Sequence, residues 1–366
     1  MSARDDLAYM EMAYGLAGKA RGRTSPNPLV GAVVVRGGAV VGHGFHEQAG
    51  RPHAEIVALG MAGRRARGAT LYLTLEPCVH WGRTPPCVDA VLAAGLRRIV
   101  VSAVDPNPLV DGRGIRRLRR AGLEVEVGLL AERNAALNEA CLKHVVRRVP
   151  FVTLKAALAM DGRIACRTGD SRWISSAAAR DYVHLLRGEQ DAVLIGSGTL
   201  LADDPRLSVR HPGWPGKKAL RAVLDRRLRF PASARMLSTP EAGPILVFAG
   251  RDAPADRARA LRDRGAEVAL PPGGAVDWTL GGVLAELGRR DVTALLVEGG
   301  QAVFTAFVEA GLADKAVLFY APRLVGGAGA PAFLGGAGAD TVARATALRN
   351  VRSFGLGGDI VVEGYF

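Results

Sequence analysis

The sequence predicts an α/β protein built from two domains. Strand-like apolar runs alternate with helix-like segments along the 366 residues, which is typical of sheets covered by helices. The length suits two domains with a core each, and the alternation restarts after Arg147-Arg148-Val149-Pro150. We therefore expect a first domain over residues 1–147 and a second over residues 148–366.

The first domain is expected to be an α/β/α sandwich. Apolar residues at helical spacing predict a helix over 5–21, and Gly37-Gly38 separates two β-rich runs as in a hairpin. The expected elements that follow the first helix are strands 29–35 and 40–45, helix 53–62, strand 70–75, helix 87–94 and strand 98–104. Asp105-Pro106-Asn107-Pro108 comes after the last strand, at the edge where open α/β sheets place ligand contacts.

The second domain shows the same alternation. Its expected buried strands are 151–158, 192–195, 222–224, 245–248, 294–297 and 316–320. The turn Glu298-Gly299-Gly300-Gln301 leads into an apolar helix over 302–310. Glycines at a helix N-terminus let backbone N–H groups approach a phosphate, although an ordinary tight turn uses the same residues. Because no G-x-G-x-x-G follows the first strand of this half, a standard Rossmann domain is disfavoured.

The strongest chemical signal lies in the first domain, where His53, Cys78 and Cys87 form a candidate zinc site. Two thiolates and an imidazole hold a tetrahedral Zn²⁺ and leave its fourth position open to water, which then ionises near neutral pH. Glu55 stands two residues after His53 and can carry a proton from that water to a leaving amine. The pattern therefore predicts hydrolytic deamination of a nucleobase-like ring.

The spacing of the two cysteines departs from the P-C-x-x-C of nucleobase deaminases, because residues 79–86 separate them. A loop must bring Cys87 back to the metal, and its polar residues His80, Arg83 and Thr84 can contact a substrate. The alternatives are a structural zinc knuckle or unconnected cysteines. A structural site would want a fourth protein ligand, and the sequence offers none at suitable spacing.

The net charge of +13 is compatible with a nucleic-acid partner or a phosphorylated substrate. Only 6 of the 48 basic residues are lysine, so the charge reflects an Arg-rich composition with solvated helix faces, and no RNA-recognition or helix-turn-helix signature is evident. No apolar run reaches the ~18 residues of a membrane span, and Asp5, Asp6 and Glu11 stand where a signal peptide is apolar. We expect a cytoplasmic protein without nucleic-acid or membrane partners, whose Cys141 and Cys166 are free thiols.

The motifs together resemble those of the bifunctional deaminase-reductases of riboflavin biosynthesis. The first half carries His53-Ala54-Glu55, Thr74-Leu75-Glu76-Pro77-Cys78, Gly82-Arg83-Thr84-Pro85-Pro86-Cys87 and Asp105-Pro106-Asn107-Pro108. The second half carries Lys155, Asp161-Gly162-Arg163, Ser171-Arg172-Trp173-Ile174, Leu201-Ala202-Asp203-Asp204-Pro205 and Glu298-Gly299-Gly300. The resemblance covers nearly the full chain. A nucleoside or tRNA-base deaminase fused to an unrelated reductase would instead show P-C-x-x-C.

The resemblance implies a cytidine-deaminase-like first domain and a dihydrofolate-reductase-like second domain. The first would hydrolyse the ring 2-amino group of 2,5-diamino-6-ribosylamino-4(3H)-pyrimidinone 5′-phosphate, and the second would use NADPH to reduce the ribosyl group to ribityl. One Zn²⁺ would bind to His53, Cys78 and Cys87, with Glu55 as the proton shuttle. The residues implied to contact base, ribose or phosphate are Asn27, His46, His80, Arg83, Asp105 and Asn107.

The resemblance also assigns the reductase site. The residues implied to surround the sugar phosphate are Lys155, Ser171, Arg187, Asp203, Leu207, Arg210 and Glu298. The residues implied to line the cofactor are Ala157, Trp173, Thr199, Asp203, Gly299 and Gly300. Asp203 or Glu298 would stabilise the positive charge that develops as the ribosylamine opens.

Arg226 departs from the family pattern, in which many members have a small hydroxyl residue near the 2′-phosphate of the cofactor. It would either pair with that phosphate or point to solvent, so the preference for NADPH over NADH stays open at this point. The implied partner is a phosphorylated pyrimidine substrate, and assembly into a homo-oligomer is compatible with the sequence.

Overall fold

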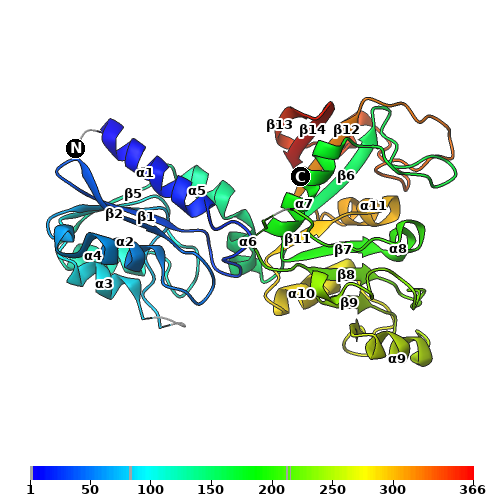
Figure 1. Cartoon of the computed structure of the whole chain (residues 1–366), viewed down its shortest axis with the longest axis horizontal. Coiled ribbons are helices and arrows are strands. Elements are labelled where there is room, and N and C mark those ends of the chain that lie inside the picture. The colour runs from blue at the N-terminus through cyan, green and yellow to red at the C-terminus, as the bar shows by residue number, and fades with distance from the viewer. Residues whose placement is uncertain (1–2, 82–84, 212, 215) are drawn as a thin grey trace. The chain divides into compact units, whose positions relative to one another are not determined.

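The computed structural model describes residues 3–81, 85–211, 213–214 and 216–366. The chain divides into two compact units, Met1–Arg148 and Val149–Phe366. Each unit is built on a sheet of its own (Figure 1), so the expected α/β class is confirmed.

The first unit is a five-stranded sheet in the order β2-β1-β3-β4-β5. Strand β1 pairs antiparallel with β2 and β3, whereas β3, β4 and β5 are parallel. The strands are β1 (Gly31–Arg36), β2 (Ala39–Phe45), β3 (Thr70–Leu73), β4 (Arg98–Val101) and β5 (Glu124–Val127). The helices are α1 (Ala3–Gly18), α2 (Ala54–Ala62), η1 (Gly63–Ala66), α3 (Cys87–Ala93), α4 (Arg113–Arg120), α5 (Ala131–Leu137) and α6 (Glu139–Arg147).

The alternation of side chains along β1 produces the layers of this unit. Ala32 and Val34 pack with α2, α3 and α4, and Val33 and Val35 pack with α1 on the opposite face. Each buried valine contributes roughly 1.5–3 kcal/mol. Gly31 allows α1 to approach the sheet closely, because a Cβ there would lie 1.9 Å from the Ala13 carbonyl oxygen.

The second unit is a nine-stranded sheet in the order β10-β9-β8-β7-β11-β6-β12-β14-β13. The pairs from β10 to β12 are parallel, and β14 pairs antiparallel with β12 and β13. The strands are β6 (Phe151–Ala159), β7 (Ala192–Gly196), β8 (Leu220–Leu224), β9 (Ile245–Phe248), β10 (Ala266–Ala269), β11 (Ala294–Val297), β12 (Lys315–Ala321), β13 (Arg349–Leu356) and β14 (Asp359–Tyr365). The helices are α7 (Ala177–Glu189), α8 (Ser197–Asp203), η2 (Pro240–Ala242), α9 (Ala255–Asp263), α10 (Leu280–Arg289), α11 (Gln301–Glu309) and η3 (Val342–Arg344).

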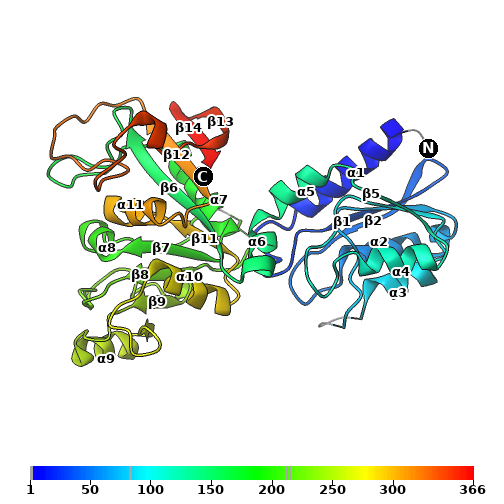
Figure 2. The same cartoon turned by 180° about the vertical axis from the view of Figure 1, so that it is seen from behind.

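The neighbouring parallel strands β7 and β11 form a switch point of the second sheet, which can be followed from both sides (Figure 1, Figure 2). After β7 the chain enters α8, whose Leu200 packs on one face, and continues to β8. After β11 it enters α11, whose Phe304 and Phe307 pack on the other face, and continues to β12. The chain therefore diverges above the carboxyl ends of β7 and β11, which opens a crevice for a ligand.

Each helix and strand expected from the sequence has a counterpart in the structure, with some differences in extent. The expected strands 70–75 and 98–104 end at Leu73 and Val101. Strands β5, β10, β13 and β14 were not expected. Cys78, Cys87, Cys141 and Cys166 form no disulfide. Within the described ranges no helix is long and apolar enough to cross a membrane.

Candidate active sites

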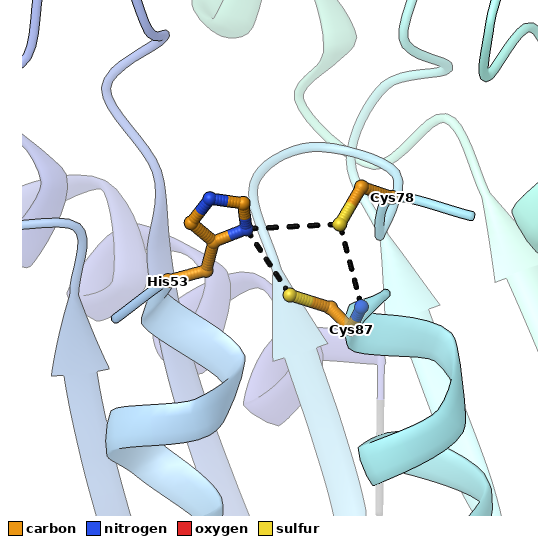
Figure 3. A group of neighbouring side chains, drawn as sticks. All are labelled: His53, Cys78 and Cys87. Carbon is orange, nitrogen blue, oxygen red and sulfur yellow. Dashed lines mark hydrogen bonds between the residues drawn. The ribbon is translucent and has the colours of Figure 1, made fainter. Parts of the chain in front are cut away.

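The three predicted zinc ligands lie together in the first unit (Figure 3). His53 directly precedes α2, Cys78 follows β3, and Cys87 begins α3. The Nδ1 atom of His53 is 3.1 Å from the Cys87 sulfur and 3.7 Å from the Cys78 sulfur. A tetrahedral zinc with ordinary Zn–S and Zn–N bonds places such atoms about 3.6 Å apart. The three residues therefore fit this metal.

Hydrogen bonds prepare Cys78 to act as an anionic ligand. The Cys87 thiol, the His53 ring and the Cys87 backbone N–H all donate to its sulfur, and together they lower the pKa of Cys78 to about 4. The hydrogen bond between the His53 ring and the Cys78 sulfur also raises the pKa of His53. Because zinc replaces the protons of its ligands when it binds, this cluster is a preformed site for the metal.

Glu55 lies in the first turn of α2 and faces the same cavity as His53 and Cys78. The residue is only 3% exposed. Burial raises the pKa of Glu55 to about 7, although the nearby His53 opposes the shift. A carboxyl group that titrates near neutrality can both accept and return a proton, which is the role expected from the sequence.

The cavity at the zinc cluster has a volume of about 270 Å³. Among the other predicted deaminase residues, those that line it are Asn27, His46, His80, Asp105 and Asn107. Arg83 lies outside the described residues. Arg51 also lines the cavity. The sequence did not predict this role, because nothing in the segment before Pro52 and His53 marks Arg51 as a site residue.

His46 orients the side chain of Asn27. Burial lowers the pKa of His46, so its ring is neutral near pH 7. Its Nδ1 lies 3.2 Å from the Pro52 carbonyl oxygen, which can only accept, so Nδ1 carries the proton. The Nε2 atom then accepts from the Asn27 amide nitrogen at 3.1 Å. This leaves the amide oxygen of Asn27 for a donor on the substrate.

Glu76 fixes one wall of the cavity, a role that the sequence did not reveal. Its buried carboxylate accepts hydrogen bonds from the backbone N–H groups of Asp105, Gly112 and Ile115 at 3.2, 2.9 and 3.1 Å. Asp105 in turn accepts from the Asn107 backbone N–H at 2.9 Å. Glu76 therefore positions the loop that carries two predicted substrate contacts. Its motif was visible in the sequence, but its partners lie up to 39 residues away.

A second cavity, of about 470 Å³, lies at the switch point of the second unit, where Gly196 ends β7 and Glu298 follows β11. It gathers most of the predicted reductase residues. Those that line it are Lys155, Ala157, Ser171, Arg187, Thr199, Asp203, Leu207, Glu298 and Gly300.

Glu298 is held between two cations in this cavity. The Lys155 ammonium is 3.3 Å from its Oε2 atom, and Arg187 pairs with both carboxylate oxygens, one of them at 2.8 Å. Burial opposes ionisation of the carboxyl group, but Arg187 and Lys155 outweigh it and hold the pKa of Glu298 well below its usual range. The cluster carries one excess positive charge, which suits a substrate phosphate.

Asp203 has a different environment from Glu298. It ends α8, and its Oδ1 accepts from the Ser171 hydroxyl at 3.3 Å. Within the described part of the chain, the Asp203 carboxylate makes no ion pair with a lysine or arginine. Its negative charge is therefore available to the contents of the cavity.

The glycine turn at the start of α11 fits a dinucleotide. Gly299 has a φ of +105°, and a Cβ on it would lie 2.8 Å from the Phe304 ring. A Cβ on Gly300 would lie 3.3 Å from the Thr199 hydroxyl. Side chains at either position would narrow the crevice, so the glycines keep backbone accessible where a pyrophosphate can approach.

Three predicted residues, Gly299, Trp173 and Arg210, are not part of the lining of this cavity, as far as the described residues show. Trp173 is 61% exposed, with the Arg180 guanidinium 4.6 Å from the centre of its ring. Arg210 donates its backbone N–H to His184 at 3.4 Å and its side chain to Ser208 at 3.0 Å.

Arg226 is bound by two carboxylates. Its guanidinium lies 3.2 Å from the Asp252 carboxylate and also pairs with Asp277. Because the two aspartates outnumber the arginine, this group carries one excess negative charge. It does not present the unpaired cation that a 2′-phosphate would attract.

Each of the two units matches a known protein family. Residues 3–103 match the family model for the cytidine and deoxycytidylate deaminase zinc-binding region, and residues 150–362 match the RibD C-terminal domain. The riboflavin biosynthesis protein RibD of Aquifex aeolicus is 44% identical over 321 residues, which cover 88% of each chain. The RibD of Synechocystis is 39% identical over 360 residues, covering 98% of this chain and 96% of that one.

Two solved structures resemble the whole chain. Acinetobacter baumannii RibD has a TM-score of 0.90 at 36% identity and covers 100% of this chain and 99% of its own. A diaminohydroxyphosphoribosylaminopyrimidine deaminase/5-amino-6-(5-phosphoribosylamino)uracil reductase of Thermotoga maritima has a TM-score of 0.87 at 35% identity and covers 99% of each chain.

Proposed function

The chain belongs to the RibD family of bifunctional deaminase-reductases in riboflavin biosynthesis, and we propose that its two reactions are divided between its two halves. Residues 1–147 carry the zinc-dependent deaminase, and residues 148–366 carry the NADPH-dependent reductase. The observation that carries this proposal is the buried Glu55 beside the His53, Cys78 and Cys87 cluster, in a cavity whose described lining residues belong to the first unit. The second cavity is lined by residues of the second unit.

In the deaminase, Glu55 moves protons while other residues hold the ring. Zinc bound to His53, Cys78 and Cys87 supplies Lewis-acid activation of water. Glu55 accepts a proton as water adds to the ring carbon that bears the 2-amino group, and it delivers a proton to that amine. The C–N bond then breaks, ammonia leaves and a carbonyl remains. Asn27, oriented by His46, accepts a hydrogen bond from the ring.

In the reductase, Lys155 and Arg187 bind the phosphate and Glu298 keeps both cations in place. NADPH supplies the hydride. As the C1′–O4′ bond of the ribosylamine breaks, O4′ takes a proton from water and becomes a hydroxyl group, and positive charge develops on the C1′=N unit, where the Asp203 carboxylate stabilises it. Addition of hydride to C1′ moves the π electrons onto nitrogen, which gives the ribitylamine. Of the two carboxylates expected from the sequence, we assign this role to Asp203, because the charge of Glu298 is already compensated.

The test is to incubate the purified protein with 2,5-diamino-6-ribosylamino-4(3H)-pyrimidinone 5′-phosphate. Ammonia release without NADPH, followed by loss of absorbance at 340 nm when NADPH is added, is the expected result. Loss of NADPH without prior release of ammonia would contradict the order of the reactions. The homo-oligomer also remains a proposal, which sedimentation of the purified chain would test.

A further inference from the structure

A groove beside the zinc cavity is lined by Arg113, Arg116, Arg117 and Arg120 of α4, together with His80 and Leu109. The four arginines are spaced i, i+3, i+4 and i+7 and therefore share one face of the helix. We call this feature the arginine groove.

The arginine groove adjoins the zinc cavity, because His80 lines both. Its position is fixed, because the buried Glu76 accepts the backbone N–H groups of Gly112 and Ile115 at the start of α4. The same Glu76 lines the zinc cavity. A ligand that extends from the zinc cavity past His80 therefore reaches the arginine face.

The arginine groove has an excess of positive charge. Arg117 pairs with Asp89, and Arg116 donates to the Asp111 backbone oxygen at 3.2 Å. Within the described residues, no carboxylate pairs with Arg113, Arg116 or Arg120. Solvated helix faces usually alternate opposite charges at these spacings, whereas like charges destabilise the helix. The repulsion among these arginines is relieved when an anion binds.

We propose that the arginine groove recruits the phosphate group of the deaminase substrate and guides it to the zinc cavity. This inference rests on the proposed function, because it is the substrate of that reaction that supplies the phosphate dianion. Clefts lined by charge of one sign raise the association rate of oppositely charged ligands. A phosphate dianion about 10 Å from a unit charge is enriched about threefold in dilute salt and about 1.5-fold at 0.15 M. The groove therefore acts on kcat/KM and leaves kcat unchanged.

The test compares two double variants of the zinc-loaded full chain. Arg113→Gln/Arg120→Gln removes two charges from the groove. Arg64→Gln/Arg119→Gln removes two exposed arginines that do not line it. Ammonia release is measured with the diaminopyrimidinone ribonucleotide, and with the same compound after removal of its phosphate by alkaline phosphatase, at about 0.01 M and 0.15 M ionic strength.

With the phosphorylated substrate, we expect the groove variant to lose about fivefold to tenfold in kcat/KM in dilute salt and about twofold at 0.15 M. The dephosphorylated compound should show no difference between the variants, and with the phosphorylated substrate the control variant should lose less than the groove variant at both ionic strengths. An equal loss with both compounds, or in both variants, would overturn the inference. Full activity of the groove variant would do the same while leaving the proposed function intact. If the unmodified protein released no ammonia, the proposed function and this inference would fall together.

Discussion

Replacement of Glu55 by glutamine tests the central step of the deaminase. The side chain is buried beside the metal ligands but is not one of them, so the variant should still bind zinc. Loss of a general acid/base lowers rates by ~10²–10⁴-fold. Because Glu55 serves both proton transfers, we expect a fall in kcat for ammonia release near the upper end of that range. The second reaction should continue at its normal rate on substrate that is already deaminated.

The same substitution should not destabilise the protein. The pKa of Glu55 is about 7 in the folded metal-free unit, compared with about 4.3 for an exposed glutamate. The folded state therefore binds more protons than the unfolded state between those pH values, so stability falls as the pH rises through this window. Above pH 7 the cost of the buried carboxylate is roughly 4 kcal/mol, and glutamine removes it.

The measurements are zinc content, kcat for ammonia release, and denaturant unfolding of the metal-free protein at pH 8. Glu132→Gln, which changes an exposed glutamate on α5, is the matched control. A loss of activity below tenfold with full zinc would refute the assignment of Glu55 as the proton shuttle. Lower stability than the parent at pH 8 would refute the account of its pKa.

Three further predictions concern the metal, the reductase carboxylates and the domain boundary. Cys87→Ser should abolish zinc binding and ammonia release while reduction of deaminated substrate continues. Metal analysis and assays of ammonia release and NADPH oxidation check this prediction, and a variant that still binds a full equivalent of zinc would contradict it. Asp203→Asn should lower kcat for reduction roughly 10²-fold with little change in stability. Glu298→Gln should instead lower the free energy of unfolding by about 3–5 kcal/mol at pH 7, because Lys155 and Arg187 stay buried without their counter-charge. Since the pKa of Glu298 is lowered, its contribution is present above about pH 4.3 and is lost as the pH falls below it. Similar losses of stability in Asp203→Asn and Glu298→Gln would contradict the different roles assigned to the two carboxylates. Fragments 1–147 and 148–366 should each catalyse one reaction, and soluble fragments that are active only when recombined would show that the sites share residues.

Most of the strands that the sequence predicted are buried on both faces, and the exception is the edge strand β2, which the Gly37-Gly38 turn reveals. β7 is buried along its whole length, so its apolar run is continuous and unambiguous. The strands that it missed lie near the sheet edges. β5 reads Glu-Val-Glu-Val and is mostly exposed, and β13 has exposed residues at most positions. Such edge strands acquire their conformation from pairing with a neighbour, which leaves little pattern in their own sequence.

The zinc cluster was predictable because all three ligands and Glu55 lie within one short stretch, from His53 to Cys87. A histidine, two cysteines and a glutamate at these positions together indicate a catalytic zinc site. Contacts between distant segments were not predictable. Glu76 meets Gly112 across 36 residues, and Glu298 meets Lys155 across 143. The ion pairs of Arg226 with Asp252 and Asp277 were likewise not predictable, because nothing in the sequence next to Arg226 indicates these partners.

Glu55 and Glu298 show why the partners of a residue decide its role. Both are buried glutamates that form part of a sequence motif, and burial acts to raise the pKa of each. Around Glu55 in the metal-free unit, the thiolate of Cys78 adds to the effect of burial, and the pKa of the carboxyl group is about 7. Around Glu298 two cations reverse the effect of burial and keep the group ionised. A carboxyl group that changes its proton near the working pH can act as an acid and a base. Glu298 stays ionised at that pH, and its carboxylate can hold Lys155 and Arg187 in place for a phosphate. Asp203 is then the reductase carboxylate whose charge can stabilise positive charge on the substrate.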